Sequence, residues 1–310
     1  MTNLRRGSRR CGILLILLLF PALGGGIMVL SPALAEALLF QPARGDPGPP
    51  PALGGVPGES IRIPTADGLK IQGWWYPLTE PQSREAESGH SEVLPSAVPP
   101  AVLLLHGNAG DISHRTPLAL GLIREGFSVL LLEYRGYGGS EGAPSEKGLH
   151  LDALAAHDFL LDRLGGSDKI VVFGRSMGGA VGAGLAVARP TGGLILESAF
   201  TSLEAMAREI YPFVPGLLFR RLRGRFDTMA RVREASVPIL VVHGSEDEVV
   251  PFRMGEDLYR AAGRWGEWLE VPGAGHNDVF LVGGTVYFRA LGDFIRKTVG
   301  GEPGGRGSPR

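Results

Sequence analysis

A serine between two glycines is the residue in this chain best placed to do chemistry. Ser176 lies in the sequence Gly-Arg-Ser-Met-Gly at 174–178, after an apolar run at 169–173 and before the small residues of 177–188. This order predicts a strand, a sharp turn and a helix, and the glycines permit the turn because they have no Cβ. A serine exposed at such an apex can act as a nucleophile if a neighbouring base removes its proton.

Two loops further along the chain supply an acid and a base. Asp247 follows the apolar run 239–243, and His276 follows the run 267–271. The order serine, acid, histidine is typical of a proton relay in which the acid orients the imidazole. We therefore predict that Ser176, Asp247 and His276 form a catalytic triad. For the acid, the alternatives are the neighbours Glu246 and Glu248, and Glu197 at the end of another apolar run.

A tetrahedral intermediate also needs hydrogen-bond donors for its oxyanion. The backbone amide of Met177 begins the helix after the serine, where it has no helical partner and the helix dipole favours negative charge. We expect the second amide from the loop His-Gly-Asn-Ala-Gly at 106–110, and we assign it to Asn108, with Ala109 as the alternative.

The elements that position these residues alternate between strand and helix. Expected strands lie at 101–105, 128–133, 169–173, 193–197, 238–243 and 267–271, and expected helices lie at 113–125, 145–163, 177–188, 254–262 and 285–299. Such alternation, with continuous apolar strands, predicts an α/β fold whose mostly parallel sheet is covered on both faces. The carboxyl ends of parallel strands share one edge, so the three triad loops can meet there. A hairpin at 59–63 and 69–76 adds antiparallel strands.

Two segments do not follow this alternation directly. Residues 201–235 are apolar and contain Pro212 and Pro215, so we expect a short cap over the sheet edge, or alternatively a connecting helix that covers the sheet. The glycine-rich segment 133–140 is expected to be structural, with Arg135 pinning neighbouring loops; the alternative is a substrate contact.

Composition excludes several classes of function. The chain has 310 residues, a net charge of −1 and 44% hydrophobic residues. Near-neutral charge gives no reason to expect a nucleic-acid partner. The only cysteine is Cys11, which excludes an intrachain disulfide. We find no histidine and carboxylate spacing typical of a metal site and no phosphate or dinucleotide motif, so we predict no metal and no cofactor.

The N-terminus resembles a targeting segment. Four arginines between residues 5 and 10 precede an uncharged stretch at 11–35, which is long enough to span a bilayer. We expect residues 1–35 to be a single-pass anchor that leaves the rest outside the cytoplasm. The alternative is a signal peptide cleaved after Ala35 that frees an exported protein. Residues 36–58 are expected to be a linker, residues 59–299 the folded domain, and residues 300–310 a disordered tail.

The motifs together resemble those of α/β-hydrolase-fold serine hydrolases. They are His-Gly-Asn-Ala-Gly at 106–110, Tyr-Arg-Gly-Tyr-Gly-Gly-Ser at 134–140, Gly-Arg-Ser-Met-Gly-Gly at 174–179, the segment 243–251 and Gly-His-Asn-Asp at 275–278. The sequence is most similar to a membrane-anchored branch that includes bud-emergence and depalmitoylating hydrolases, and Leu-Leu-Phe-Gln-Pro at 38–42 also resembles that branch. The loop at 80–99 is longer and more polar than in that pattern. The cap is short, which favours an open cleft.

This resemblance implies hydrolysis of carboxylic esters or thioesters through an acyl-enzyme. Ser176 would be the nucleophile, Asp247 the acid and His276 the base. The expected partner is a small acyl ester or thioester. The same triad also cleaves amides, so an amidase or peptidase is an alternative. A non-catalytic binding module tethered to the cell envelope is the alternative from another class, because a fold does not fix a function.

Overall fold

The computed structural model describes residues 39–43, 45–78, 99–222 and 224–300. The predicted anchor or signal peptide at 1–35 and residues 301–310 of the predicted tail lie outside these ranges. No helix within the described part combines the length and the apolar character needed to cross a bilayer.

An eight-stranded sheet forms the centre of the molecule, in the order β10-β9-β8-β7-β4-β6-β3-β2. Six of its strands run parallel, and the hairpin of β2 and β3 joins antiparallel at one edge. The strands are β2 (Glu59–Pro64), β3 (Lys70–Tyr76), β4 (Ala101–Leu105), β6 (Ser128–Leu132), β7 (Ile170–Arg175), β8 (Gly193–Glu197), β9 (Ile239–Gly244) and β10 (Gly266–Val271). The predicted mostly parallel α/β sheet is therefore confirmed.

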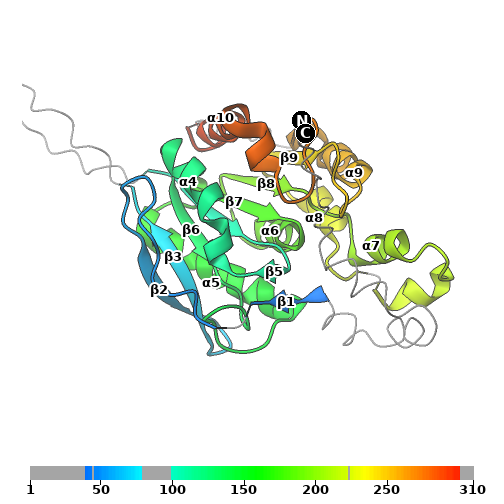
Figure 1. The fold of residues 1–310 in the computed structure, drawn as a ribbon, viewed down its shortest axis with the longest axis horizontal. Helices are drawn as coiled ribbons and strands as arrows, with labels where there is room; N and C mark the ends of the chain where they lie inside the picture. Colours follow the sequence, from blue (N-terminus) through cyan, green and yellow to red (C-terminus); the bar gives the residue numbers. More distant parts are fainter. Residues whose placement is uncertain (1–38, 44, 79–98, 223, 301–310) are drawn as a thin grey trace, which may run out of the picture.

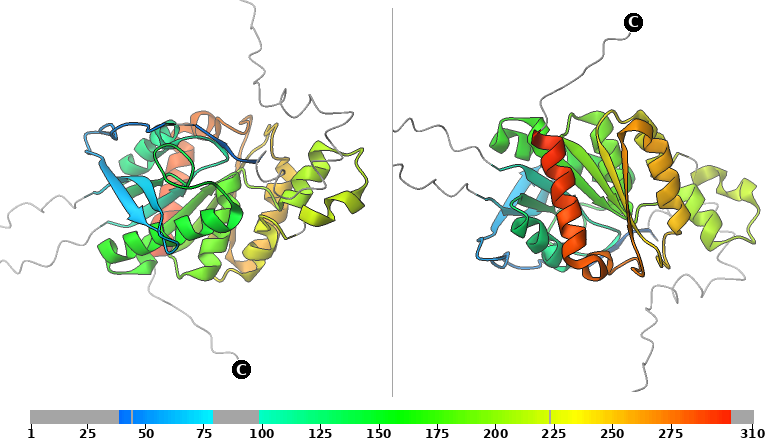
Figure 2. Two further views of the ribbon diagram at one scale, coloured as in Figure 1. Left: turned by 90° about the horizontal axis from the view of Figure 1, so that it is seen from below. Right: turned by 90° about the horizontal axis from the view of Figure 1, so that it is seen from above.

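Helices cover both faces of this sheet (Figures 1 and 2). One face packs against α5 (Glu146–Leu164), α6 (Met177–Ala188), α8 (Thr228–Glu234) and α9 (Phe252–Ala262), and the other against α4 (Thr116–Arg124) and α10 (Val279–Gly300). Each face has its own apolar core, because successive side chains of a strand point to opposite faces. The central strands β4, β6 and β8 are buried on both faces, which explains their apolar sequences. Short 3-10 turns complete the connections at η1 (Ile112–Arg115), η2 (Ser167–Lys169) and η4 (Gly263–Trp265).

The last helical element, α10, is interrupted at Gly284, whose φ of 50° and ψ of −136° are not helical. The part after this interruption agrees with the helix expected at 285–299, and a further helical segment that begins at Val279 precedes it. A positive φ is accessible to glycine without a steric penalty, which permits the sharp kink between the two parts.

The segment predicted as a cap contains α7 (Leu203–Ile210), η3 (Gly216–Leu222) and α8. The part formed by α7 and η3 projects beyond the sheet, at the right of Figure 1. It exposes the apolar side chains of Ile210, Phe213 and Leu217, and Phe213 is 92% exposed. In contrast, α8 packs against α6 and α9 and joins the core on one face of the sheet, so the segment is divided between the two alternatives, a projecting cap and a covering helix.

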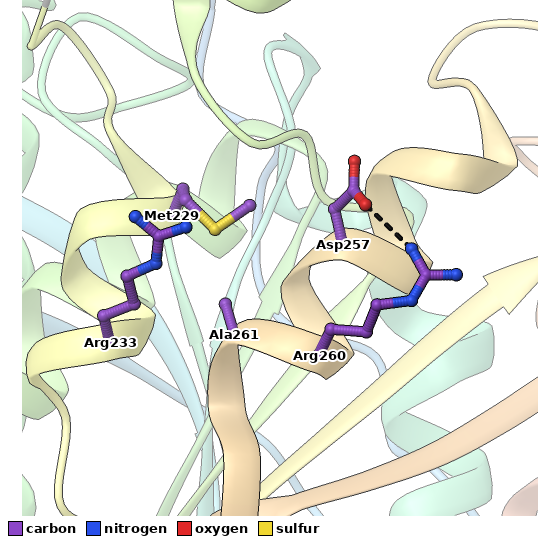
Figure 3. Close-up of a pocket in the computed structure, with 5 residues that line it drawn as sticks. All are labelled: Met229, Arg233, Asp257, Arg260 and Ala261. Atoms are coloured by element: carbon purple, nitrogen blue, oxygen red, sulfur yellow. Dashed lines mark hydrogen bonds and ion pairs between the residues drawn. The ribbon is translucent and has the colours of Figure 1, made fainter.

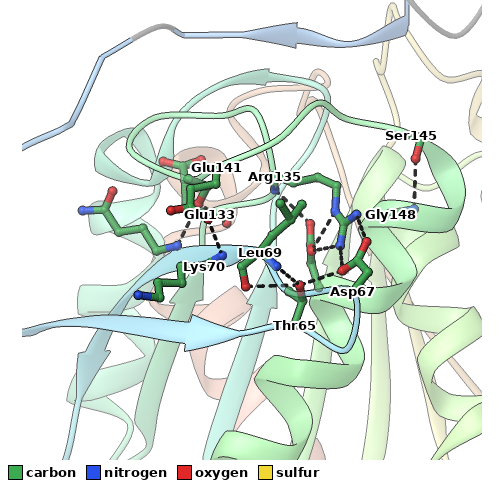
Figure 4. A network of polar contacts seen from close by, with 12 residues as sticks. Thr65, Asp67, Leu69, Lys70, Glu133, Arg135, Glu141, Ser145 and Gly148 are labelled. Carbon is green, nitrogen blue, oxygen red and sulfur yellow. Dashed lines mark hydrogen bonds and ion pairs between the residues drawn. The ribbon is translucent and has the colours of Figure 1, made fainter.

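Arg135 joins three separate parts of the chain, as Figure 4 shows. Its guanidinium donates to both carboxylate oxygens of Asp67, in the β2–β3 turn, at 2.7 and 3.0 Å, and to Asp152 of α5 at 2.8 and 2.9 Å. Its backbone N–H also donates to Asp152. The prediction that Arg135 pins neighbouring loops is confirmed.

A short strand lies within the segment predicted as a linker. In β1, Gln41–Pro42 pairs in parallel with β5, Ala109–Gly110, which belongs to the predicted oxyanion loop. The expectation of a plain linker over 36–58 is therefore wrong at 41–42. A pairing of two residues is too short to leave a hydrophobic period in the sequence.

Candidate active site

Ser176 lies at the turn between β7 and α6, in a strained backbone conformation. Its φ and ψ are 53° and −119°, a region that residues with a Cβ rarely adopt. A Cβ on Gly178 would lie 2.1 Å from the Leu105 carbonyl oxygen, and one on Gly174 would lie 2.4 Å from the Gly178 oxygen. The two flanking glycines are therefore required by packing. The turn leaves Ser176 partly exposed, whereas both of its neighbours are buried.

Asp247 and His276 meet at the same edge of the sheet. Nδ1 of His276 lies 2.9 and 3.1 Å from the two carboxylate oxygens of Asp247. Asp247 also accepts the backbone N–H groups of Val249 and Val250, and its Oδ2 lies 3.3 Å from Nε2 of His243. The Asp247 side chain is fully buried. The His276 ring and two backbone N–H groups therefore fix this carboxylate, while Nε2 of His243 also lies 3.0 Å from the Val250 carbonyl oxygen. The contact through Nδ1 leaves Nε2 of His276 as the ring atom available for chemistry.

These contacts control the ionisation of Asp247. Burial alone would raise its pKa, but hydrogen bonds from His243 and His276 outweigh burial and hold the pKa well below its usual range. Asp247 is thus an anion throughout the neutral range, which is the state that can stabilise an imidazolium on His276.

Arg175 links the histidine loop to the serine turn. Its guanidinium donates to the His276 carbonyl oxygen at 2.5 Å and to Oδ1 of Asn277 at 3.1 Å. It also forms an ion pair with Glu197 at 3.0 Å. Since Arg175 immediately precedes Ser176, these bonds hold the histidine loop beside the nucleophile. In the described structure no hydrogen bond joins Oγ of Ser176 to His276, and such bonds are often longer in ligand-free enzymes.

The alternative acids are occupied elsewhere. Glu197 binds Arg175 and accepts the hydroxyl of Tyr287. Glu248 accepts the backbone N–H of His276 rather than its ring, and Glu246 is exposed. The geometry thus favours Asp247, and the triad assignment stays a prediction about function.

The predicted oxyanion loop lies directly against the nucleophile. A Cβ on Gly107 would lie 3.4 Å from Cβ and 3.9 Å from Oγ of Ser176. Nδ1 of the buried His106 lies 2.7 Å from the Gly107 carbonyl oxygen. The C=O and N–H of a trans peptide point in opposite directions, so this contact turns the Asn108 N–H away from the His106 ring.

A buried carboxylate, that of Glu133, contacts the His106 ring at Nε2. Oε1 of Glu133 lies 3.2 Å from Nε2 of His106, and both side chains are fully buried. Oε2 of Glu133 accepts the Ile112 N–H. The sequence analysis placed Glu133 in a structural segment and did not connect it with the oxyanion loop. The signal in the sequence that could have identified Glu133 is its position, because it is an acidic residue at the end of an apolar strand.

The strand β1 forms a strap over the same loop, which we define as residues 39–43. The Asn108 carbonyl accepts the Gln41 N–H at 2.9 Å and the Tyr137 hydroxyl at 2.8 Å. The Asn108 side-chain amide donates to the Leu39 carbonyl, and the Ala43 N–H donates to the Gly110 carbonyl. The strap therefore holds the peptide that follows Asn108, the Asn108 side chain and the Gly110 carbonyl. Sequence reasoning missed this role entirely.

The surface of the described residues has two hollows. A small pocket borders the site and is lined by His114, Arg115, Leu118, Arg175, Asn277 and Phe280. A groove between α8 and α9 is lined by Met229, Arg233, Asp257, Arg260 and Ala261 (Figure 3). None of the predicted site residues lines this groove, so we do not assign the chemistry to it.

Known proteins are similar to this chain in sequence and in fold. Residues 100–226 match the family model described as alpha/beta hydrolase fold. An uncharacterized protein of Mycobacterium tuberculosis is 38% identical, over 94% of this chain and 97% of its own length. The alpha/beta hydrolase domain-containing protein WAV2 of Arabidopsis thaliana is 35% identical, over 77% and 79%. The lysophosphatidylserine lipase ABHD12 of Danio rerio is 34% identical, over 63% and 56%.

A solved structure shows the same fold at lower identity. The esterase Pf2001 of Pyrococcus furiosus has a TM-score of 0.59 and 21% identity, covering 81% of this chain and 99% of its own. The parallel sheet, the turn at Ser176 and these relatives agree, and the chain belongs to the α/β-hydrolase fold family.

Proposed function

We propose that this protein is a serine hydrolase that cleaves carboxylic esters or thioesters through an acyl-enzyme. Nε2 of His276 takes the proton as Oγ of Ser176 attacks the acyl carbon, and Asp247 supports the imidazolium. The amides of Met177 and Asn108 hold the oxyanion. His276 then protonates the leaving alcohol or thiol as its bond to the acyl carbon breaks. Water, activated by His276, hydrolyses the acyl-enzyme and restores Ser176.

One observation carries this proposal: the buried, hydrogen-bonded pair of Asp247 and His276 stands beside a strained serine turn. A strained backbone persists only where the surrounding structure enforces it, and such residues cluster at functional sites. The carboxylate fixes the tautomer of His276 that presents Nε2 as a base. The similarity to a lysophosphatidylserine lipase, and in fold to an esterase, is consistent with this chemistry.

The expected acyl group is apolar and of short to medium length, because apolar side chains after the serine turn and in the cap segment join one packed cluster. Phe200 and Met206 pack in the same cluster as Met177, directly after the turn. Phe226 joins this cluster and contacts Phe40 of the strap, with their ring centroids 6.2 Å apart. Apolar walls of this kind bind hydrocarbon chains through burial.

A panel of butyryl compounds tests the function. We expect the wild-type protein to hydrolyse an aryl ester and a thioester with a burst of leaving group that matches the enzyme concentration when deacylation is the slower step, and to cleave the corresponding anilide far more slowly. Ser176→Ala should lose the activity, by a factor on the order of 10⁶ by analogy with measured triads. Ser60→Ala, at an exposed position of β2, serves as the matched control. Equal turnover by Ser176→Ala and the wild type would contradict the proposal.

We also propose that the uncharged segment at 11–35 tethers the enzyme to the cell membrane, with the catalytic domain outside the cytoplasm. The arginines before this segment support that orientation. Membrane fractionation combined with sequencing of the mature N-terminus tests the tether. Recovery of a soluble exported protein that starts after Ala35 would contradict it and favour the cleaved form.

A further inference from the structure

The pocket beside the catalytic loops carries two arginines that take no part in the proton transfers of the proposed mechanism. It lies between η1 and α4 on one side and the beginning of α10 on the other. Arg115 and Arg175 both line it, with Asn277 and the exposed side chain of His114 at its edge. Leu118 and Phe280 supply its apolar wall.

The two guanidinium groups differ in how their charges are compensated. Arg175 forms an ion pair with the buried Glu197. Arg115 donates to the Ala109 carbonyl oxygen at 2.6 Å, and none of the carboxylates in the described residues lies within ion-pair distance of it. Its Nε is buried and has no hydrogen-bond partner there. Glu133 and Asp111 act on Arg115 only from a longer range.

An incompletely paired cation in such a position is costly to the fold. Burial, and then the positive charge of Arg175, lower the pKa of Arg115 to about 10. Arg115 nevertheless remains charged at neutral pH. Two guanidinium groups that repel each other across one pocket form the arrangement that a carboxylate or phosphate would relieve, since the guanidinium group offers paired donors to both anions.

The location of the pocket indicates which part of a substrate reaches it. Asn277 directly follows His276, and Arg175 holds the His276 carbonyl. The leaving group departs toward the histidine, because the histidine protonates it. The apolar residues that favour the acyl chain belong to the opposite face of the sheet, in the core cluster of α5, α6 and α8.

We propose that the pocket of Arg115 and Arg175 binds an anionic group, a carboxylate or a phosphate, on the leaving-group portion of the ester. This inference rests on the proposed esterase function and specifies its substrate class. The substrate would combine an apolar acyl chain with a negatively charged alcohol.

Matched pairs of substrates test the subsite. For phosphate the pair is 1-butyrylglycerol 3-phosphate and 1-butyrylglycerol, and for carboxylate it is 3-(butyryloxy)propanoate and its primary amide. The measured quantity is the ratio of kcat/KM for the anionic ester to kcat/KM for its neutral partner. We expect a ratio above one for the wild type in at least one pair, and the larger ratio identifies the anion.

Three variants and a control locate the effect. Arg115→Met should lower the ratio on the order of tenfold, as expected for the loss of a charge-assisted hydrogen bond, and Arg115→Lys should restore part of it. Asn277→Asp, which places a carboxylate against Arg175, should also lower the ratio. Arg124→Met removes an exposed charge from α4, outside the pocket, and should leave the ratio unchanged.

The outcomes of this experiment distinguish a failure of the anionic subsite from a failure of the proposed esterase function. Arg115 also supports the oxyanion loop, so Arg115→Met can slow both esters of a pair; an equal loss with an unchanged ratio means a structural role and overturns the subsite. A wild-type ratio of one or less in both pairs, with the neutral esters still hydrolysed, also overturns the subsite and leaves the esterase function intact. Failure to hydrolyse any ester overturns both.

Discussion

Removal of the strap should damage catalysis far more than folding. We compare a protein that lacks residues 1–38 with one that lacks residues 1–43. The second loses four hydrogen bonds to the loops of Asn108, Gly110 and Gly138, together with the burial of Phe40, which is only 7% exposed. These contacts contribute about 6 kcal/mol at usual values. Fixing five residues of backbone costs about the same amount, so the stability difference should stay within about 2 kcal/mol.

The catalytic effect has a different origin. Without the strap, Asn108 keeps only the Tyr137 hydroxyl and the His106 contact to hold its two peptides. An oxyanion donor that is lost or misplaced costs about 10²–10³ in kcat. We therefore expect the shorter protein to show a kcat lower by roughly tenfold to 10³-fold, with a smaller change in KM.

Steady-state kinetics with an aryl butyrate and urea unfolding of both truncated proteins measure these quantities. Phe40→Ala in the longer protein should reproduce part of the loss, and Phe213→Ala, at an exposed site, should not. Equal kcat values for the two truncated proteins would refute the reasoning. So would a loss of kcat fully explained by unfolding.

Two further predictions follow from the site. Ser176→Gly should be more stable than Ser176→Ala by about 1 kcal/mol in urea unfolding, because glycine relieves the strain at φ 53°; equal stability would mean that the turn is not strained. Asp247→Asn should lower kcat by about 10⁴, as in measured triads. The depressed pKa of Asp247 contributes stability above the unfolded pKa of about 3.9 that is lost as pH falls through the folded pKa. The stability of Asp247→Asn should therefore fall less than that of the wild type between about pH 5 and pH 2, and parallel pH profiles would contradict this linkage.

Much of the fold follows from local patterns. The strands of the central sheet are short apolar runs bounded by turn residues, and each was expected within two residues of its place. The meeting of the loops of Asp247 and His276 follows from the rule that parallel strands end at a common edge. The paired glycines around Ser176 were also informative, because only a tight turn with close backbone packing requires both.

The remaining features depend on contacts between distant segments. The strap pairs Gln41 with a loop more than sixty residues away, and no periodicity marks a pairing of two residues. The support of His106 by Glu133, and of the histidine loop by Arg175, involves buried polar side chains whose partners are set only by the packed sheet. A sequence identifies such residues as candidates, but their partners come from tertiary structure.

The central claim is that Ser176 is a nucleophile activated by His276 and Asp247. The most direct measurement is labelling of the purified protein with a fluorophosphonate, followed by peptide mass spectrometry to locate the adduct. We expect one adduct, on Ser176, and its loss in His276→Ala. An adduct on another residue, or labelling of Ser176 at the wild-type rate in His276→Ala, would contradict the triad.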